Sequence, residues 1–229
     1  MGTSASFRAP ATPRWQAFTT ALQTGQPLER LQSELFNAGA AWERELGAPA
    51  VAAYAVVLLE AHASLPDRLR AAERPEQALQ AMIAEARAAS ETHPGSAAGA
   101  MAERAFLGLL TRVTAGERSL AQAAPEQAAE RFTAARGTAS ELVTGYIGEL
   151  LGQYARHVTA REAGRLTEGD EGLGVGATRR LTRSLAAAAG RVGREAPAPA
   201  ADGDAIRRAW QPLISEAFAR GGRLPAPGR

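Results

Sequence analysis

Apolar residues recur every three to four positions along most of this sequence, a spacing that places them on one side of an α-helix. The clearest stripe lies in residues 28–46. Its members are Leu31, Leu35, Ala38, Trp42 and Leu46. Gly47 ends the pattern, so residues 28–46 are predicted to form one helix with a single buried side.

The segment after Pro49 is apolar in every direction around the helix axis. Proline is well suited to the first turn of a helix, and Val56, Val57, Leu58 and Leu59 follow as an uninterrupted apolar run. A helix without a polar side has to be enclosed by other elements. Residues 49–65 are therefore predicted to form the central, most buried helix of the fold.

Proline, glycine and capping residues mark the ends of further helices, and Ser96 and an aspartate of the Asp202-Gly203-Asp204 sequence are predicted to cap two of them. Segment 125–164 is predicted to be the longest, although Gly137 and three later glycines cost about 1 kcal/mol each relative to alanine and could divide it. Pro212 predicts a kink in the last helix, or two shorter helices in its place. The other predicted helices span residues 13–23, 75–86, 97–115, 177–194 and 204–222.

No segment alternates between apolar and polar residues as a strand does, so the fold is predicted to be all-α. We expect a multi-helix bundle or stacked helical hairpins, with about 7–9 helices, more than about 60% helix and no sheet. The expected organisation is a flexible lead-in (1–12), a main helical domain (13–168), a Gly-rich linker (169–176), an Arg-rich amphipathic helix (177–194), an Ala/Pro linker (195–203), a C-terminal helix (204–222) and a tail (223–229).

The charge balance is less basic than the isoelectric point suggests. All 26 basic residues are arginines, and the net charge is only +2 although the pI is about 9.6. Arginine does not lose its proton in the working pH range, so the high pI does not by itself indicate a nucleic-acid partner. Abundant Ala, Arg and Gly without lysine are also typical of a GC-rich bacterial genome.

Missing residue types exclude several kinds of chemistry. Without lysine there is no Schiff base and no Walker-A phosphate loop, and without cysteine there is no thiol catalysis and no thiolate metal ligand. His62, His93 and His157 are isolated from one another and from acidic residues at metal-ligand spacing. We expect no catalytic residue, cofactor or metal site, and we interpret His157 as a core or interface histidine with one hydrogen bond.

Basic residues gather on one side of the helix predicted at 177–194. At 100° per residue these arginines fall within an arc of about 120°, opposite an apolar arc of about 100°. We call them the arginine face: Arg179, Arg180, Arg183, Arg191 and Arg194. No acidic residue occurs from position 172 to 194. Such a face can bind phosphates, meet an acidic protein surface, lie on an anionic membrane or simply face solvent.

Three glycines share one side of the long predicted helix. Gly145, Gly148 and Gly152 lie within about 60° of one another and opposite the apolar stripe through Tyr146 and Tyr154. Glycine permits close contact between backbones, so these positions are candidates for tight helix packing. The alternative is a solvated side with no partner.

These observations favour a non-catalytic helical assembly or adaptor subunit that acts through protein–protein contacts, with a protein partner or a second copy of the chain. The first alternative is a nucleic-acid backbone binder, such as a small subunit of a nucleoprotein complex, that uses the arginine face. The second is a helical ligand-binding protein or enzyme. The longest uncharged run, residues 46–59, is shorter than the ~20 residues that a bilayer requires, so we expect a cytoplasmic protein without a membrane span.

Overall fold

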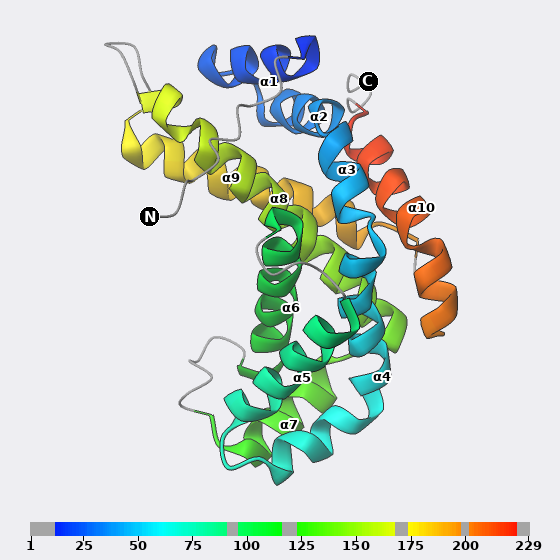
Figure 1. The fold of residues 1–229 in the computed structure, drawn as a ribbon. Helices are drawn as coiled ribbons and strands as arrows, with labels where there is room; N and C mark the ends of the chain where they lie inside the picture. The colour runs from blue at the N-terminus through cyan, green and yellow to red at the C-terminus, as the bar shows by residue number, and fades with distance from the viewer. Residues whose placement is uncertain (1–11, 91–95, 116–122, 168–173, 198–201, 224–229) are drawn as a thin grey trace, which may run out of the picture.

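The computed structural model describes residues 12–90, 96–115, 123–167, 174–197 and 202–223. In these ranges 87% of residues are helical and no strand is present, which confirms the all-α prediction. The described part contains ten helices (Figure 1), with these bounds: α1 Pro13–Gln23, α2 Leu28–Ala38, α3 Ala40–Leu46, α4 Pro49–Ala71, α5 Pro75–Ser90, α6 Ala97–Ala115, α7 Pro125–Ala135, α8 Ala139–Thr167, α9 Val175–Arg194 and α10 Gly203–Gly221.

The helix count exceeds the prediction of 7–9 because two of the predicted helices are divided. The first division, at Gly39, separates α2 from α3 and corrects the single helix expected over 28–46. A Cβ at Gly39 would overlap the hydroxyl of Tyr154 and lie 2.7 Å from the Phe218 ring. Two aromatic rings thus occupy the space that a side chain at position 39 would need.

The second division lies between α7 and α8. Gly137 has φ +57°, in the left-handed region that side chains with a Cβ rarely adopt, so the helix of α7 ends there. Thr138 and Glu141 then begin α8 with reciprocal hydrogen bonds of 2.7 and 3.1 Å between backbone N–H groups and side chains. Of the four glycines that could divide the segment, Gly137 is the one that does.

Helix α4 lies at the centre of the fold, as predicted. It contacts α5, α7, α8 and α10, and Val56, Leu58 and Leu65 are each no more than 1% exposed. Among the described residues, α4 is the one helix with the length and apolar composition to cross a membrane, and 61% of its most apolar window is buried within the protein. The core helix of a globular protein meets the same criterion.

Helices α8 and α9 form the most extensive helix pair (Figure 1). Gly148 of α8 contacts Gly193 of α9, whereas Gly152, one turn later, faces Ala186. Because the contact positions rise along α8 and fall along α9, the two helices are antiparallel. Most of the apolar side of α9 is buried against this partner, including Leu185, Ala188, Ala189 and Val192.

Helix α10 returns to the N-terminal part of the chain. The indole N–H of Trp210 donates to the carbonyl of Leu46 at 2.8 Å, and the hydroxyl of Ser33 donates to the carbonyl of Gly222 at 2.7 Å. Asp202 caps the helix through its carboxylate. The helix continues through Pro212 as a single element and does not divide into two.

Several of the predicted connecting segments fall outside the described residues. These are residues 1–11 of the lead-in, 169–173 of the Gly-rich linker, 198–201 of the Ala/Pro linker and 224–229 of the tail.

Candidate functional site

The arginine face lies on the outer side of α9. All five of its arginines are exposed, and the apolar side of the helix is packed on α8. The stem of Arg194 borders this contact, since a Cβ at Gly148 of α8 would lie 2.7 Å from its Cγ. Helix α9 contains no acidic residue. The five arginine side chains are therefore accessible to solvent. The helix that carries them is held in place by its extensive buried contact with α8.

The arginines of the face differ in pairing from a group of arginines that link helices elsewhere in the described part of the chain. Elsewhere, guanidinium groups join neighbouring helices: Arg68 binds Glu85 at 2.8 Å, and Arg87 binds Glu103 at 2.6 Å. No arginine of the face has a carboxylate within ion-pair distance among the described residues. Within the described residues, several arginines therefore form ion pairs, as Arg68 and Arg87 do, whereas the five of the arginine face form none.

The three glycines singled out in the sequence face two different helices. Gly148 lies against Gly190 and Gly193 of α9, where an added Cβ would approach the Gly190 carbonyl oxygen to 2.9 Å. A Cβ at Gly152 would lie 3.3 Å from the carbonyl oxygen of Ala186. At Gly145 it would meet Leu109 of α6 at 3.2 Å. The first two positions thus set how closely α8 approaches the helix that carries the arginine face.

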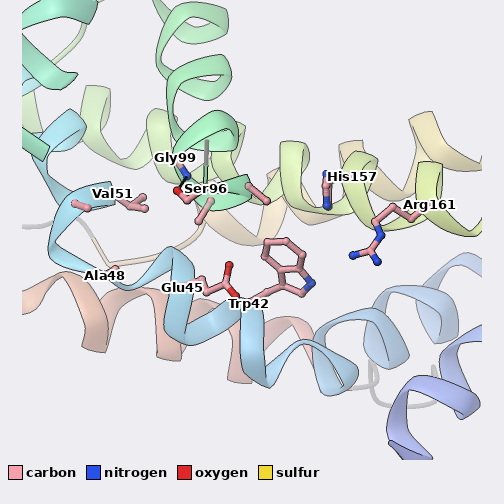
Figure 2. A pocket seen from close by; sticks show the side chains of 11 residues that line it. Trp42, Glu45, Ala48, Val51, Ser96, Gly99, His157 and Arg161 are labelled. Carbon is pink, nitrogen blue, oxygen red and sulfur yellow. Dashed lines mark hydrogen bonds between the residues drawn. The ribbon is translucent and has the colours of Figure 1, made fainter. Parts of the chain in front are cut away.

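A second candidate site is a cavity of about 640 Å³, which we call the Trp42 pocket (Figure 2). Helices α3, α4, α6 and α8 contribute to its wall. The side chains of Trp42, His157 and Arg161 lie together, with the first turn of α6 nearby. The ring of His157 meets the indole of Trp42 edge-on, with centroids 5.1 Å apart and planes at 71°.

Basic groups dominate the electrostatics around His157. Burial lowers the pKa of His157 below its ordinary value of 6.5, and the positive charges of Arg161 and Arg104 lower this pKa further. His157 is therefore neutral at pH 7 and forms no hydrogen bond within the described part of the chain. The single hydrogen bond expected from the sequence is replaced by the contact with Trp42.

The other histidines do not join this pocket. His62 donates through Nε2 to the carbonyl of Gly137 at 3.0 Å, which connects α4 to the turn between α7 and α8. His93 lies outside the described residues. Within the described ranges, no group of three or more histidine, aspartate or glutamate residues is arranged to hold a metal ion.

Sequence reasoning identified the arginine face but did not locate the Trp42 pocket. The sequence pattern predicts that Trp42 lies in an apolar stripe, that Ser96 caps a helix and that His157 lies in the core or in an interface. The hydroxyl of Ser96 does cap α6 by accepting the N–H of Gly99 at 3.0 Å. Nothing in the local pattern indicates that these three residues, more than 50 positions apart, surround one cavity.

Comparisons with family models, curated proteins and solved structures gave no match to this chain.

Proposed function

We propose that the protein is a non-catalytic α-helical adaptor and that the arginine face of α9 is its docking surface for an acidic partner protein. The observation that carries this proposal is that five exposed arginines gather on one helix and none of them has a carboxylate partner among the described residues. Arginine binds carboxylates through a planar, bidentate arrangement of N–H donors, and it is favoured at protein interfaces.

The spacing along α9 suits an acidic protein surface. Arg179, Arg180 and Arg183 form one group, and Arg191 and Arg194 form a second group about 12 Å further along the axis at 1.5 Å per residue. The net charge of the whole chain is only +2, so its attraction for a distant polyanion is weak and is screened within about 10 Å. The two arginine groups of α9, on a protein with a small net charge, therefore favour short-range binding of acidic side chains.

Nucleic-acid backbone binding is the second candidate, and a separate observation favours it. The run without acidic residues from position 172 to 194 gives a guanidinium face that extends about 22 Å, long enough to meet several phosphates. Helix α9 has no aromatic residue that could stack on a base. A nucleic acid at this face would be held by its phosphates, without sequence preference.

The test compares two triple variants with the same change in charge. The first replaces Arg179, Arg180 and Arg183 with glutamine. The control makes the same replacement at exposed arginines away from the face, Arg14, Arg44 and Arg208. Glutamine is nearly as good a helix former as arginine, so both variants should keep the helical circular dichroism of the wild type.

Each protein is used to retain partners from a nuclease-treated extract of its source, and retained proteins are quantified by mass spectrometry. An adaptor predicts acidic proteins that wild type and control retain and the face variant loses. Anisotropy titrations with duplex DNA and single-stranded RNA test the second candidate. Under that candidate, the log–log salt slope becomes less negative by about 0.7–0.9 for each phosphate contact removed. If all three proteins retain the same partners and the wild type binds no nucleic acid, both proposals are wrong.

A further inference from the structure

The arginine face of α9 has a gap in its middle. Between Arg183 and Arg191 the exposed residues are Ser184 and Ala187, and the rest of this stretch is buried. Serine and alanine are short, so the helix surface between the two groups of arginines is lower than the surface at either end. We call these two positions the saddle.

The saddle is about as long as a helix is wide. Arg183 and Arg191 lie about 12 Å apart along the axis of α9 at 1.5 Å per residue, and an α-helix with its side chains is about 10–12 Å across. Long side chains of a helix lean toward its N-terminal end, as Arg194 does, whose Nη1 would lie 3.3 Å from a Cβ at Gly190. Because both groups of arginines lean in the same direction, the distance between them is kept.

The backbone beside the saddle is fixed by its contact with α8. A Cβ at Gly152 of α8 would lie 3.3 Å from the carbonyl oxygen of Ala186, and one at Gly148 would lie 2.9 Å from the carbonyl oxygen of Gly190. Main chain thus packs closely against main chain on the buried side of α9. A surface that is already ordered loses little conformational entropy when a partner binds.

We propose that the partner protein presents an acidic amphipathic α-helix, which crosses α9 at the saddle between the two groups of arginines. This inference rests on the proposed function, because it specifies which element of an acidic partner binds. Short residues at a crossing point allow the usual distance of about 8–10 Å between two helix axes. The flanks of the crossing helix would then face Arg180 and Arg183 on one side, and Arg191 and Arg194 on the other, where carboxylates complement the positive charges.

The crossing geometry specifies the spacing of residues on the partner helix. A small residue at position i meets the saddle, and its neighbours at i−4 and i+4 lie on the same strip of the helix. At 100° per residue, one flank of this strip contains i−3 and i+1, and the other contains i−1 and i+3. Two pairs of glutamates at these positions would meet the two groups of arginines.

The experiment measures binding of two labelled peptides to the full chain by fluorescence anisotropy. The flanked peptide, of about 20 residues, has alanine at i−4, i and i+4 and glutamate at the four flanking positions. The dispersed peptide has the same composition and charge, in an order that spreads its glutamates around the helix. At about 0.15 M salt we expect a dissociation constant below about 100 μM for the flanked peptide and at least about tenfold weaker binding of the dispersed one.

A variant with a filled saddle tests the crossing point without changing any charge. Ser184→Leu/Ala187→Leu should weaken the flanked peptide at least about tenfold, because leucine side chains hold the two helices apart. The matched control is Ala81→Leu/Ala84→Leu, which places two leucines at the same spacing on exposed positions of α5. This control should bind both peptides as the wild type does. Leucine is a good helix former, so both variants should keep the circular dichroism of the wild type.

The outcomes separate this inference from the proposed function. If the two peptides bind equally, or if the filled saddle or the control changes both affinities alike, the crossing helix is wrong. The proposed function still stands in that case if the glutamine variant of Arg179, Arg180 and Arg183 loses both peptides. If neither peptide binds up to about 1 mM, the inference is also wrong, and the retention experiment decides the proposed function separately.

Two other occupants of the saddle are tested with the same proteins. A duplex DNA that binds the wild type more tightly than the flanked peptide does would favour the nucleic-acid candidate and overturn the inference. Sedimentation of the chain alone tests for a second copy at this surface. A dimer that the filled saddle disrupts and the control preserves would mean that another copy of this chain occupies the saddle, which would overturn the proposal of a separate partner helix.

Discussion

The contact between α8 and α9 gives the sharpest stability prediction, because it brings backbone against backbone. A Cβ on Gly193 would lie 2.7 Å from Cα of Gly148 and 2.8 Å from its nitrogen, closer than real Cβ contacts. Main-chain atoms cannot rotate away as a side chain can, so Gly193→Ala should force the two helices apart. Overpacking of this kind costs about 1–3 kcal/mol.

Part of that cost is offset because alanine favours the helical state by up to about 1 kcal/mol over glycine. Because the contact is with backbone atoms, the cost falls in the upper part of that range, about 2–3 kcal/mol, and we expect Gly193→Ala to lower the free energy of unfolding by about 1–2 kcal/mol. For a chain of this size, that corresponds to a fall in Tm of about 2–8 °C. Urea unfolding followed by circular dichroism at 222 nm measures the free energy, and a thermal scan gives the Tm.

Gly176→Ala is the matched control on the same helix. A Cβ there would find only the end of the Arg180 side chain, at 3.7 Å, so the helix preference of alanine should dominate. This variant should be more stable than the wild type by about 0.5–1 kcal/mol. A Gly193→Ala protein as stable as the wild type, or a destabilised Gly176→Ala protein, would refute the proposed backbone contact.

Three further predictions concern the core and the pocket. Leu58→Ala should lower the free energy of unfolding in urea by about 2–5 kcal/mol, because Leu58 is fully buried at the centre of α4. A decrease of less than about 1 kcal/mol would contradict this burial. Tyr154→Phe should lower the free energy of unfolding by about 1 kcal/mol in the same assay, since the Tyr154 hydroxyl donates to the carbonyl of Leu35 at 2.8 Å. An unchanged urea midpoint would mean that this hydrogen bond does not contribute to stability. Finally, the pKa of His157 in the folded protein is below 6.5, so the unfolded chain binds a proton at this residue more readily than the folded chain does. The free energy of unfolding should therefore fall as the pH drops below about 6.5, and it should level off below the folded-state pKa of His157. His157→Gln should reduce that fall between pH 7 and 5, and an identical pH profile in the variant would rule out His157 as its source.

Local pattern predicted the features that belong to a single helix. The buried run of α4, the caps at Ser96 and Asp202 and the arginine face are all defined by residues within one or two helical turns of one another. Spacing and side-chain type are sufficient for such features, because the geometry of a helix is known in advance.

Features that depend on distant residues could not be read in this way. The apolar spacing from Leu31 to Leu46 continues across Gly39 without interruption. At the break, the space beside Gly39 is occupied by Tyr154 and Phe218, more than 100 positions later in the sequence. The Trp42 pocket likewise depends on how α3, α6 and α8 meet. The spacing of residues within any one of these helices gives no information about how the helices pack against one another.

The return of α10 to the first helices has a consequence for synthesis of the protein on the ribosome. Trp210 stacks on Tyr146 with ring centroids 5.9 Å apart, and Phe218 packs edge-on against Phe36 at 5.2 Å. Until α10 has left the ribosomal exit tunnel, Phe36 and Tyr146 lack these covering rings, and the nascent chain presents apolar surface. A chain that ends before Trp210 should therefore expose more aromatic surface than the full chain, and tryptophan fluorescence would report the packing of Trp210 on Tyr146.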